Sequence, residues 1–387
     1  MASEPLRITV NKAPSPFPEV IGVETRIGGS KEIATLEVNG KRFTNWTSVH
    51  VETRAGDWFP QFHFECSEES PMPLQWDAVQ FVPGDVVKVY MGGIQAVFGY
   101  IVERHVAFDG RTHGVKLVGC GDTFDLTNSS VPPEKLGSHD GKSWTQLAQD
   151  LSSHLKIKVH QVGAVDNTPF DNIHVLPGET ISQTLERYAR HRNIVIGSAA
   201  TGGLVAIGEH PAVSSGDLVE GIHMLRANAV VRDEKVYLKI FAMGQNTGSD
   251  KQNGDVINKQ IAMLEGTSTR NRVIVVVADL ADKPHGIQRR ALMEKGFTEG
   301  SKIEAQITVQ GWFKDNNNSN DLWRSGEYYS VNSPSLIMNG MTLGCKGCVY
   351  EQSNQGTTTT LNLVDPMHMN GQLNFRNAAI AYRNSKR

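Results

Sequence analysis

The side chains best able to do chemistry in this chain are its cysteines, of which there are four among 387 residues. Cys345 and Cys348 form a C-x-x-C pair, a spacing typical of zinc sites and of disulfide exchange. A structural zinc needs four ligands, however, and the sequence has no second C-x-x-C and no H-x-x-x-H. Disulfide exchange favours a helix N-terminus, whereas this pair follows Gly344 in a strand-like pattern. We therefore interpret both cysteines as small buried residues at a hairpin.

The other two cysteines lie in expected strands. Cys120 is flanked by Gly119 and Gly121, which could suggest a nucleophile on a sharp turn. A nucleophile elbow requires the spacing G-x-S-x-G between a strand and a helix, and the glycine spacing here is different. We interpret Cys120 as a buried residue at a strand end, and Cys66 as a residue on the apolar side of its alternating strand.

Histidines are numerous, with 13 in the chain, but none forms the zinc-binding pattern H-E-x-x-H. His50, His63 and His105 lie on expected strands of one β-domain and could converge on a metal ion. Scattered histidines are more often exposed or hydrogen-bonded, and we favour that interpretation. Carboxylates are also dispersed, and no glycine-rich phosphate-binding loop occurs. The sequence therefore predicts no catalytic, cofactor-binding or metal-binding residue, no cofactor and no enzymatic activity.

The charge and hydropathy of the chain exclude further classes of function. Lys and Arg number 38 against 41 Asp and Glu, and no basic block occurs, which argues against binding of nucleic acid by phosphate neutralisation. No apolar run approaches the ~20 residues that span a bilayer. The N-terminus lacks a positive region followed by an apolar segment, so we expect synthesis in the cytoplasm and no membrane association.

Cys66, Cys120 and the three histidines lie within residues 25–129, whose pattern indicates short strands and turns. Residues 1–24 precede them and include Pro14, Pro16 and Pro18, which predict an extended segment. Asn-Gly between β-prone runs, at Asn39, is a strong hairpin signal because a type I′ turn needs positive φ at both positions. Further hairpins are expected at Gly92-Gly93 and Asp109-Gly110. Together these strands predict a β-barrel.

Residues 130–222 have a different pattern, with helical as well as strand-like segments. Ser143 and Gln146 fit a capping box, as do Thr180 and Gln183, and each pair precedes a run with apolar residues at helical spacing. Strand-like segments separate these two helices and follow the second, ending in a hairpin over 194–207. This region is predicted to be a small mixed α/β domain.

Strands return over residues 223–366, which resemble the first region in texture and predict a second β-barrel interrupted by one helix. Residues 273–278 form an apolar run that we expect to be a buried strand. Residues 284–295 are predicted to be the helix. Its inward residues are expected to be Ile287, Ala291 and Leu292. Residues 244–268 and 315–321 are expected to be polar loops, and the tail 367–387 has no clear pattern.

The start of the second expected helix has a competing interpretation. Residues 176–181 (LPGETI), followed by Leu185 and Tyr188, resemble the opening of a LysM peptidoglycan-binding module. A LysM module continues with a short loop and a second helix, whereas here the hairpin over 194–207 follows. A glycan-binding or cell-wall-acting protein is therefore kept as the alternative function.

The order of landmarks along the chain resembles a known family, the central baseplate hub proteins of Mu-like contractile-tailed phages. Late control protein D and the hub part of VgrG proteins are related members. The landmarks are, in order, 120–126 (CGDTFDL) ahead of Pro132-Pro133, 144–151 (WTQLAQDL), 177–180 (PGET) leading into 185–190 (LERYAR), 305–312 (AQITVQGW) ahead of Leu322-Trp323, and 359–366 (TTLNLVDP).

The resemblance implies a virion structural protein whose two β-domains are like those of tail-tube proteins. It implies a homotrimeric ring that adapts a sixfold tail tube to a threefold central spike and forms part of the DNA channel. The expected partners are the spike, the tail tube or its initiator, and baseplate wedge components, with DNA in transit only. The predicted fold class is therefore mainly β, with two tail-tube-like β-barrel domains flanking a small mixed α/β domain.

Overall fold

The computed structural model describes residues 32–68, 81–108, 113–244, 261–278, 284–315 and 318–370. The first part of the chain forms strands alone: β1 (Ala34–Val38), β2 (Lys41–Phe43), β3 (Ser48–Arg54), β4 (Gln61–Glu68), β5 (Val86–Met91), β6 (Ile94–Phe108) and β7 (His113–Gly121).

Helices enter in the middle part of the chain. Its elements are α1 (Phe124–Asn128), η2 (Pro133–Lys135), β8 (Gly137–Ser138), α2 (Trp144–Ser152), η3 (Ser153–Leu155), β9 (Val159–Val162), β10 (His174–Val175), α3 (Ile181–Arg192), β11 (Val195–Ser198) and β12 (Leu204–Ile207).

The last part returns to strands. Its elements are β13 (Ser214–Val219), β14 (Met224–Val231), β15 (Lys239–Gly244), β16 (Ile261–Glu265), β17 (Val273–Ala278), α5 (Pro284–Gly300), β18 (Ile303–Gln310), β19 (Phe313–Asp315), β20 (Asn318–Leu322), β21 (Tyr328–Ser333), β22 (Met338–Ser353), β23 (Gly356–Val364) and α6 (Pro366–Asn370).

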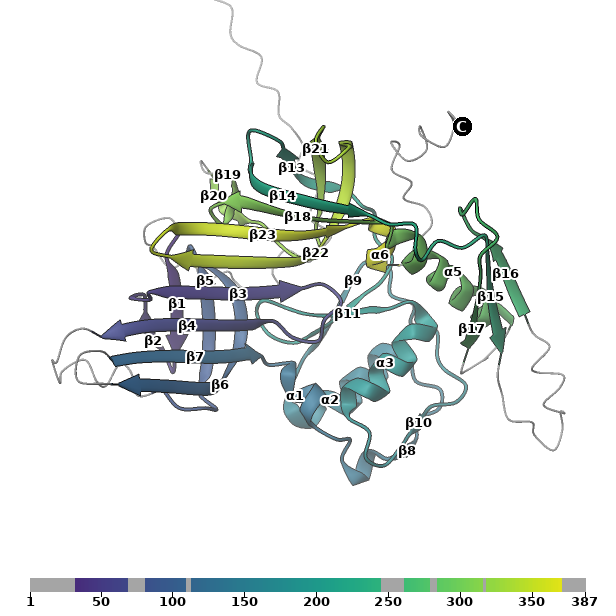
Figure 1. Cartoon of the computed structure of the whole chain (residues 1–387). Coiled ribbons are helices and arrows are strands. Elements are labelled where there is room, and N and C mark those ends of the chain that lie inside the picture. The colour runs from purple at the N-terminus through teal and green to yellow at the C-terminus, as the bar shows by residue number, and fades with distance from the viewer. Residues whose placement is uncertain are drawn as a thin grey trace, which may run out of the picture.

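One large sheet of 13 strands unites the first and last parts of the chain (Figure 1). Its main path runs β14-β18-β23-β22-β3-β4-β7-β6-β5-β1-β2, and the antiparallel pairing of β22 with β3 joins the two parts. A single apolar core receives side chains from both, including Phe62, Leu117, Ile307 and Leu361. The mainly β fold with an α/β insert is confirmed. The pairings among the described residues leave the sheet open at β14 and β2, so neither part closes into a barrel through them.

The predicted hairpins are present wherever the structure describes their turns. Asn39 and Gly40 have φ values of 49° and 80° between Val38 and Lys41, which are paired. A second hairpin turns between β5 and β6 at the two glycines that were predicted for it. The turn expected at Asp109-Gly110 lies outside the described residues, although β6 and β7 pair as antiparallel neighbours.

Both predicted capping boxes form in the insert. The hydroxyls of Ser143 and Thr180 accept hydrogen bonds from the backbone N–H of Gln146 and Gln183, whose side chains bond back to the caps. Helices α2 and α3 follow and bury Trp144 in a core of their own. The predicted hairpin is β11 with β12, and β9 extends it as a parallel neighbour of β12.

Three expectations for the last part of the chain were wrong in detail. Strand β16 occupies part of the expected loop 244–268, because its residues alternate between two faces of a sheet. Strand β20 occupies part of the expected loop 315–321, where pairing with β19 overrides the polar composition. The helix continues to Gly300, and Leu292 is exposed, while Ile287 and Ala291 are buried as predicted.

The expectation of a buried strand over 273–278 was also wrong. Strand β17 belongs to a separate sheet of three strands, in the order β16-β15-β17. Helix α5 covers one face of this sheet through Ile287 and Ala291 (Figure 1). Val273, Val275 and Val277 point to the other face and are exposed. An apolar run predicts burial of both faces, but this sheet has a helix on one face alone.

Candidate functional site

The C-x-x-C cysteines are buried on β22, which forms an antiparallel hairpin with β23 and has a bulge after Cys345. The thiol of Cys345 donates to the carbonyl of Gly347 at 3.2 Å, and that of Cys348 to the carbonyl of Trp323 at 3.4 Å. Burial raises the pKa of Cys348 to about 12 and that of Cys345 well above its ordinary value. Both thiols are therefore protonated at neutral pH in this enclosed environment, which makes them poor nucleophiles.

The remaining cysteines take the places predicted for them. Cys120 is buried at the end of β7, and burial raises the pKa of its thiol to about 11. Cys66 is half-buried on β4 and packs against the large core. No group of three or more His, Cys, Asp or Glu residues within the described ranges is placed to hold a metal ion.

The structure brings together two of the three histidines singled out by sequence. The rings of His50 and His63 stack with centroids 4.6 Å apart and planes 9° apart. Burial, followed by the charge of His50, lowers the pKa of His63. Nδ1 of His50 lies 3.5 Å from a carboxylate oxygen of Glu351 on β22. His105 is apart from this pair and bonds to Glu103 at 2.9 Å.

The segment that resembles a LysM opening forms α3 and its cap. Tyr188 is buried, and its hydroxyl accepts from the N–H of His174 at 2.8 Å. The carboxylate of Glu179 accepts from Arg187 at 2.9 Å and from Thr184 at 3.0 Å. These side chains therefore fix the helix against the rest of the insert, and Tyr188 is not available to stack on a sugar ring.

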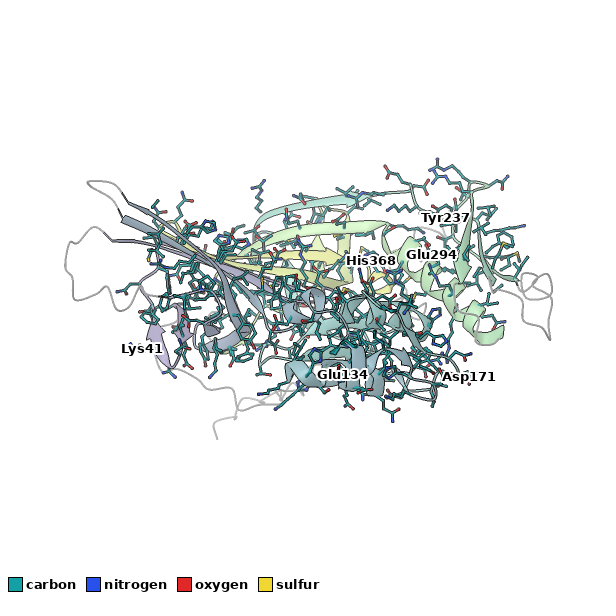
Figure 2. All side chains as sticks on the ribbon, turned by 90° about the horizontal axis from the view of Figure 1, so that it is seen from below. Lys41, Glu134, Asp171, Tyr237, Glu294 and His368 are labelled. Atoms are coloured by element: carbon teal, nitrogen blue, oxygen red, sulfur yellow. The ribbon has the colours of Figure 1, made fainter. Side chains whose placement is uncertain are left out.

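Two hollows lined by described residues lie at seams between parts of the chain. One, of about 160 Å³, lies between the insert and the large sheet and includes Arg54, His160 and Arg324 in its lining. The other, of about 510 Å³, lies between α3 and α5. Figure 2 shows two of its lining residues, Glu294 and His368, close together. Neither hollow pairs a nucleophile with a base, so these seams carry no recognisable catalytic geometry.

The junction of the large sheet with the insert contains a buried carboxylate that sequence reasoning did not single out. The oxygens of Asp122 accept from the N–H of Gly203 at 3.1 and 2.9 Å. Gly203 has a φ of 107°, and an added Cβ at Gly202 would collide with Phe98. The backbone conformation of the turn between β11 and β12 therefore places the N–H of Gly203 against the carboxylate of Asp122. Burial outweighs these backbone hydrogen bonds and raises the pKa of Asp122 to about 6.

This junction is expected to be more stable in mild acid. Because the folded pKa of Asp122 lies above its ordinary value, its contribution is full below about pH 4 and is lost as the pH rises through about 6. The shift corresponds to at most about 3 kcal/mol. Urea unfolding of the wild type and of Asp122→Asn at pH 5 and pH 7.5 measures it. We expect the wild type to lose more stability than the variant between these pH values, and equal losses would contradict the assignment.

A second buried polar cluster, also missed from the sequence, lies in the last part of the chain. Nζ of Lys314 is 2.5 Å from Oε2 of Glu327 and 3.1 Å from Oδ1 of Asp321. Tyr329 donates its hydroxyl to Glu327 at 3.0 Å. The signal in the sequence is weak, because Lys314 and Glu327 come from separate strands and turns. The cluster is enclosed and structural.

The known proteins that this chain resembles are phage baseplate proteins. Residues 33–121 match the family model of the Mu phage baseplate assembly protein GpP-like N-terminal domain. Residues 123–208 match that of the baseplate hub protein gp44-like second domain. The baseplate hub protein gp44 of Escherichia phage Mu is 23% identical over 327 residues, which cover 80% of this chain and 83% of that protein. The chain is therefore similar to Mu-like baseplate hub proteins.

Solved structures agree with this family in fold. The 43 kDa tail protein of prophage MuSo2 from Shewanella oneidensis superimposes with a TM-score of 0.75 and 19% identity, covering 87% of this chain and 99% of that one. A tail protein from Neisseria meningitidis MC58 gives a TM-score of 0.72 and 18% identity, with coverage of 88% and 99%. Among the described residues of this chain, no helix is long and apolar enough to cross a bilayer.

Proposed function

We propose that this chain is a structural subunit of the baseplate hub of a contractile phage tail, or of a prophage or tailocin particle, and not an enzyme. The observation that carries the proposal is the similarity to the hub protein of phage Mu, which extends over 327 residues and so includes the sheet as well as the insert. The buried cysteines, which pack within the sheets, fit a structural role. The subunit is made in the host cytoplasm and acts in the virion.

The finer part of the proposal is a ring of three copies. Each copy supplies two tube-like β-units, so that the ring presents pseudo-sixfold symmetry to the tail tube and threefold symmetry to the central spike. Among the described strands, β14 and β2 end the large sheet with one edge unpaired. Free sheet edges favour association, and neighbours in a ring would cover them. The domain division at 24, 129, 222 and 366 is part of this proposal.

The outward face of the large sheet suits a channel through which DNA passes. Gln306 on β18 hydrogen-bonds Asn228 on β14 and Asn362 on β23, each at 3.3 Å. Thr308 on β18 and Thr360 on β23 hydrogen-bond each other at 3.1 Å. Amides and hydroxyls that bond one another offer phosphates no cation, and Arg226, opposite Thr308, is the one cation on the described part of β14 at this face. We propose that this face lines the channel.

The mass of the purified protein in solution tests the ring. Light scattering behind a sizing column is expected to give close to three times the 42.5 kDa of one chain. A monomer that persists at high concentration would contradict a ring formed by this chain alone. It would favour the alternative, a peptidoglycan-binding tail protein, which a pull-down with insoluble peptidoglycan tests directly.

A further inference from the structure

The outward face of the large sheet carries charged side chains as well as the amides and hydroxyls described above. Figure 1 shows its strands side by side, from β14 at the top through β18, β23, β22, β3 and β4 to β7 below. Residues paired across neighbouring strands point to the same side of a sheet, so the register defines this face. We call it the channel face. The cations that the register places on it are Arg54, Lys116, Arg226 and Arg232.

Two of these cations are held by a carboxylate from a neighbouring strand. Nζ of Lys116 on β7 lies 2.9 Å from Oε1 of Glu65, its register partner on β4. Nη1 of Arg232, which directly follows β14, lies 2.5 Å from Oε2 of Glu304 on β18. All four side chains are at least 40% exposed, so solvent and any molecule that passes along the face can reach them.

The other two cations have different surroundings. Nε of Arg54 lies 2.6 Å from Glu52 on the same strand and 3.8 Å from Asp57 in the following turn. Arg226 stands opposite Thr308, which supplies no charge. Lys116 and Arg232 are therefore the cations of this face whose charge is met by a carboxylate across a strand pair.

The remaining basic residues on this side of the sheet are engaged as well. His50 stacks on His63 and lies 3.5 Å from the carboxylate of Glu351. Burial, followed by the charge of His50, lowers the pKa of His63. Lys346, at the bulge of β22, lines the hollow between α3 and α5.

An ion pair of this kind changes what the face offers to DNA. A carboxylate oxygen at 2.5–2.9 Å from a cation takes the place that a phosphate oxygen would take on the same cation. Contacts between cations and phosphates supply most of the affinity of proteins for DNA of any sequence. A duplex that moves through a channel must not be retained by its wall, so cations on that wall need to be occupied.

We propose that Glu65 and Glu304 prevent the channel face from retaining DNA, because they occupy Lys116 and Arg232. One pair joins β4 to β7 in the first part of the chain, and the other joins β18 to the end of β14 in the last part. Both β-parts thus contribute one masking carboxylate. The partner concerned is duplex DNA, met through its phosphates and without regard to sequence. This inference rests on the proposed channel and names the residues that keep its wall from binding.

Removal of the two negative charges tests the inference. The double variant Glu65→Gln with Glu304→Gln keeps the length of both side chains and releases two cations on each copy. Fluorescence anisotropy of a labelled duplex of random sequence, at pH 7.5 and about 50 mM salt, measures binding. We expect the variant to bind at least about tenfold more tightly than the wild type. The gain should disappear at about 200 mM salt, because contacts with phosphates weaken steeply as salt rises.

A matched control changes the net charge by the same amount at another place. Glu186 on α3 lies 2.6 Å from Arg190, and Glu294 on α5 lies 2.8 Å from Arg290. The double variant Glu186→Gln with Glu294→Gln also releases two arginines, but on helices and not on the channel face. It is expected to bind the duplex no better than the wild type.

The outcomes separate this inference from the proposed ring. If both double variants gain affinity equally, the effect is one of net charge, and the inference is overturned. It is also overturned if Glu65→Gln with Glu304→Gln binds no better than the wild type. Light scattering decides the ring independently, because the channel face is exposed on a single copy and the binding assay works for a monomer too. Circular dichroism of each variant verifies that it is folded.

Discussion

Replacing Glu327 by alanine is expected to lower the free energy of unfolding by about 3–5 kcal/mol, measured by urea denaturation at pH 7. Lys314 is 8% exposed and Glu327 is 3% exposed, so the ion pair between them is enclosed. The variant leaves the Lys314 ammonium with Asp321 as its remaining carboxylate, and leaves the Tyr329 hydroxyl without its acceptor in Glu327. A buried charge that loses its partner costs more than the pair contributed.

An exposed ion pair on the same large sheet provides the control. Arg232 and Glu304 are 2.5 Å apart on neighbouring strands, and both side chains are well exposed. Glu304→Ala is expected to cost less than about 1 kcal/mol. The double variant Lys314→Met with Glu327→Leu should recover most of the loss, because it removes both charges. The argument fails if Glu327→Ala costs no more than Glu304→Ala.

The cluster of Lys314 and Glu327 could not be predicted from the sequence. Turns and caps were predictable because their signals lie within a few residues, as at Asn39-Gly40 and at Thr180 with Gln183. The ion pair of Lys314 with Glu327 depends on how β19, β20 and β21 meet. No local pattern encodes that meeting, so neither residue was singled out.

The joining of the two β-parts into one sheet could not be predicted from local sequence patterns either. The pairing of β3 with β22 brings together Val51 and Tyr350, which are separated by most of the chain. Each strand alternates as predicted, but alternation does not name the neighbouring strand. Two separate barrels and one continuous sheet therefore give the same sequence pattern.

The apolar run of β17 shows a different limit. Its length and composition predicted burial, and the strand itself was found where expected. What the sequence does not show is how many faces of the small sheet are covered within one copy.

The second large effect is expected at Trp144. Its side chain is fully buried in the insert, and its indole N–H donates to the carbonyl of Leu185 at 2.8 Å. The residue thus joins α2 to α3 through packing and one hydrogen bond. Trp144→Ala is expected to destabilise the insert by about 3–5 kcal/mol. Trp144→Phe retains most of the packing and should cost about 1–2 kcal/mol, chiefly for the lost hydrogen bond.

Trp46 provides the matched control, because it is partly buried at the margin of the large core and contacts Phe64 at 5.0 Å between ring centroids. Trp46→Ala should lower the free energy of unfolding less than Trp144→Ala does. It should also leave the insert resistant to proteolysis. Limited proteolysis in urea distinguishes them, with early cleavage within 123–208 expected for Trp144→Ala alone. Because Trp144 is enclosed in the core of the insert, Trp144→Ala should still form the proposed trimer in native buffer. Loss of the trimer with the large sheet intact would place the contact between copies on the insert.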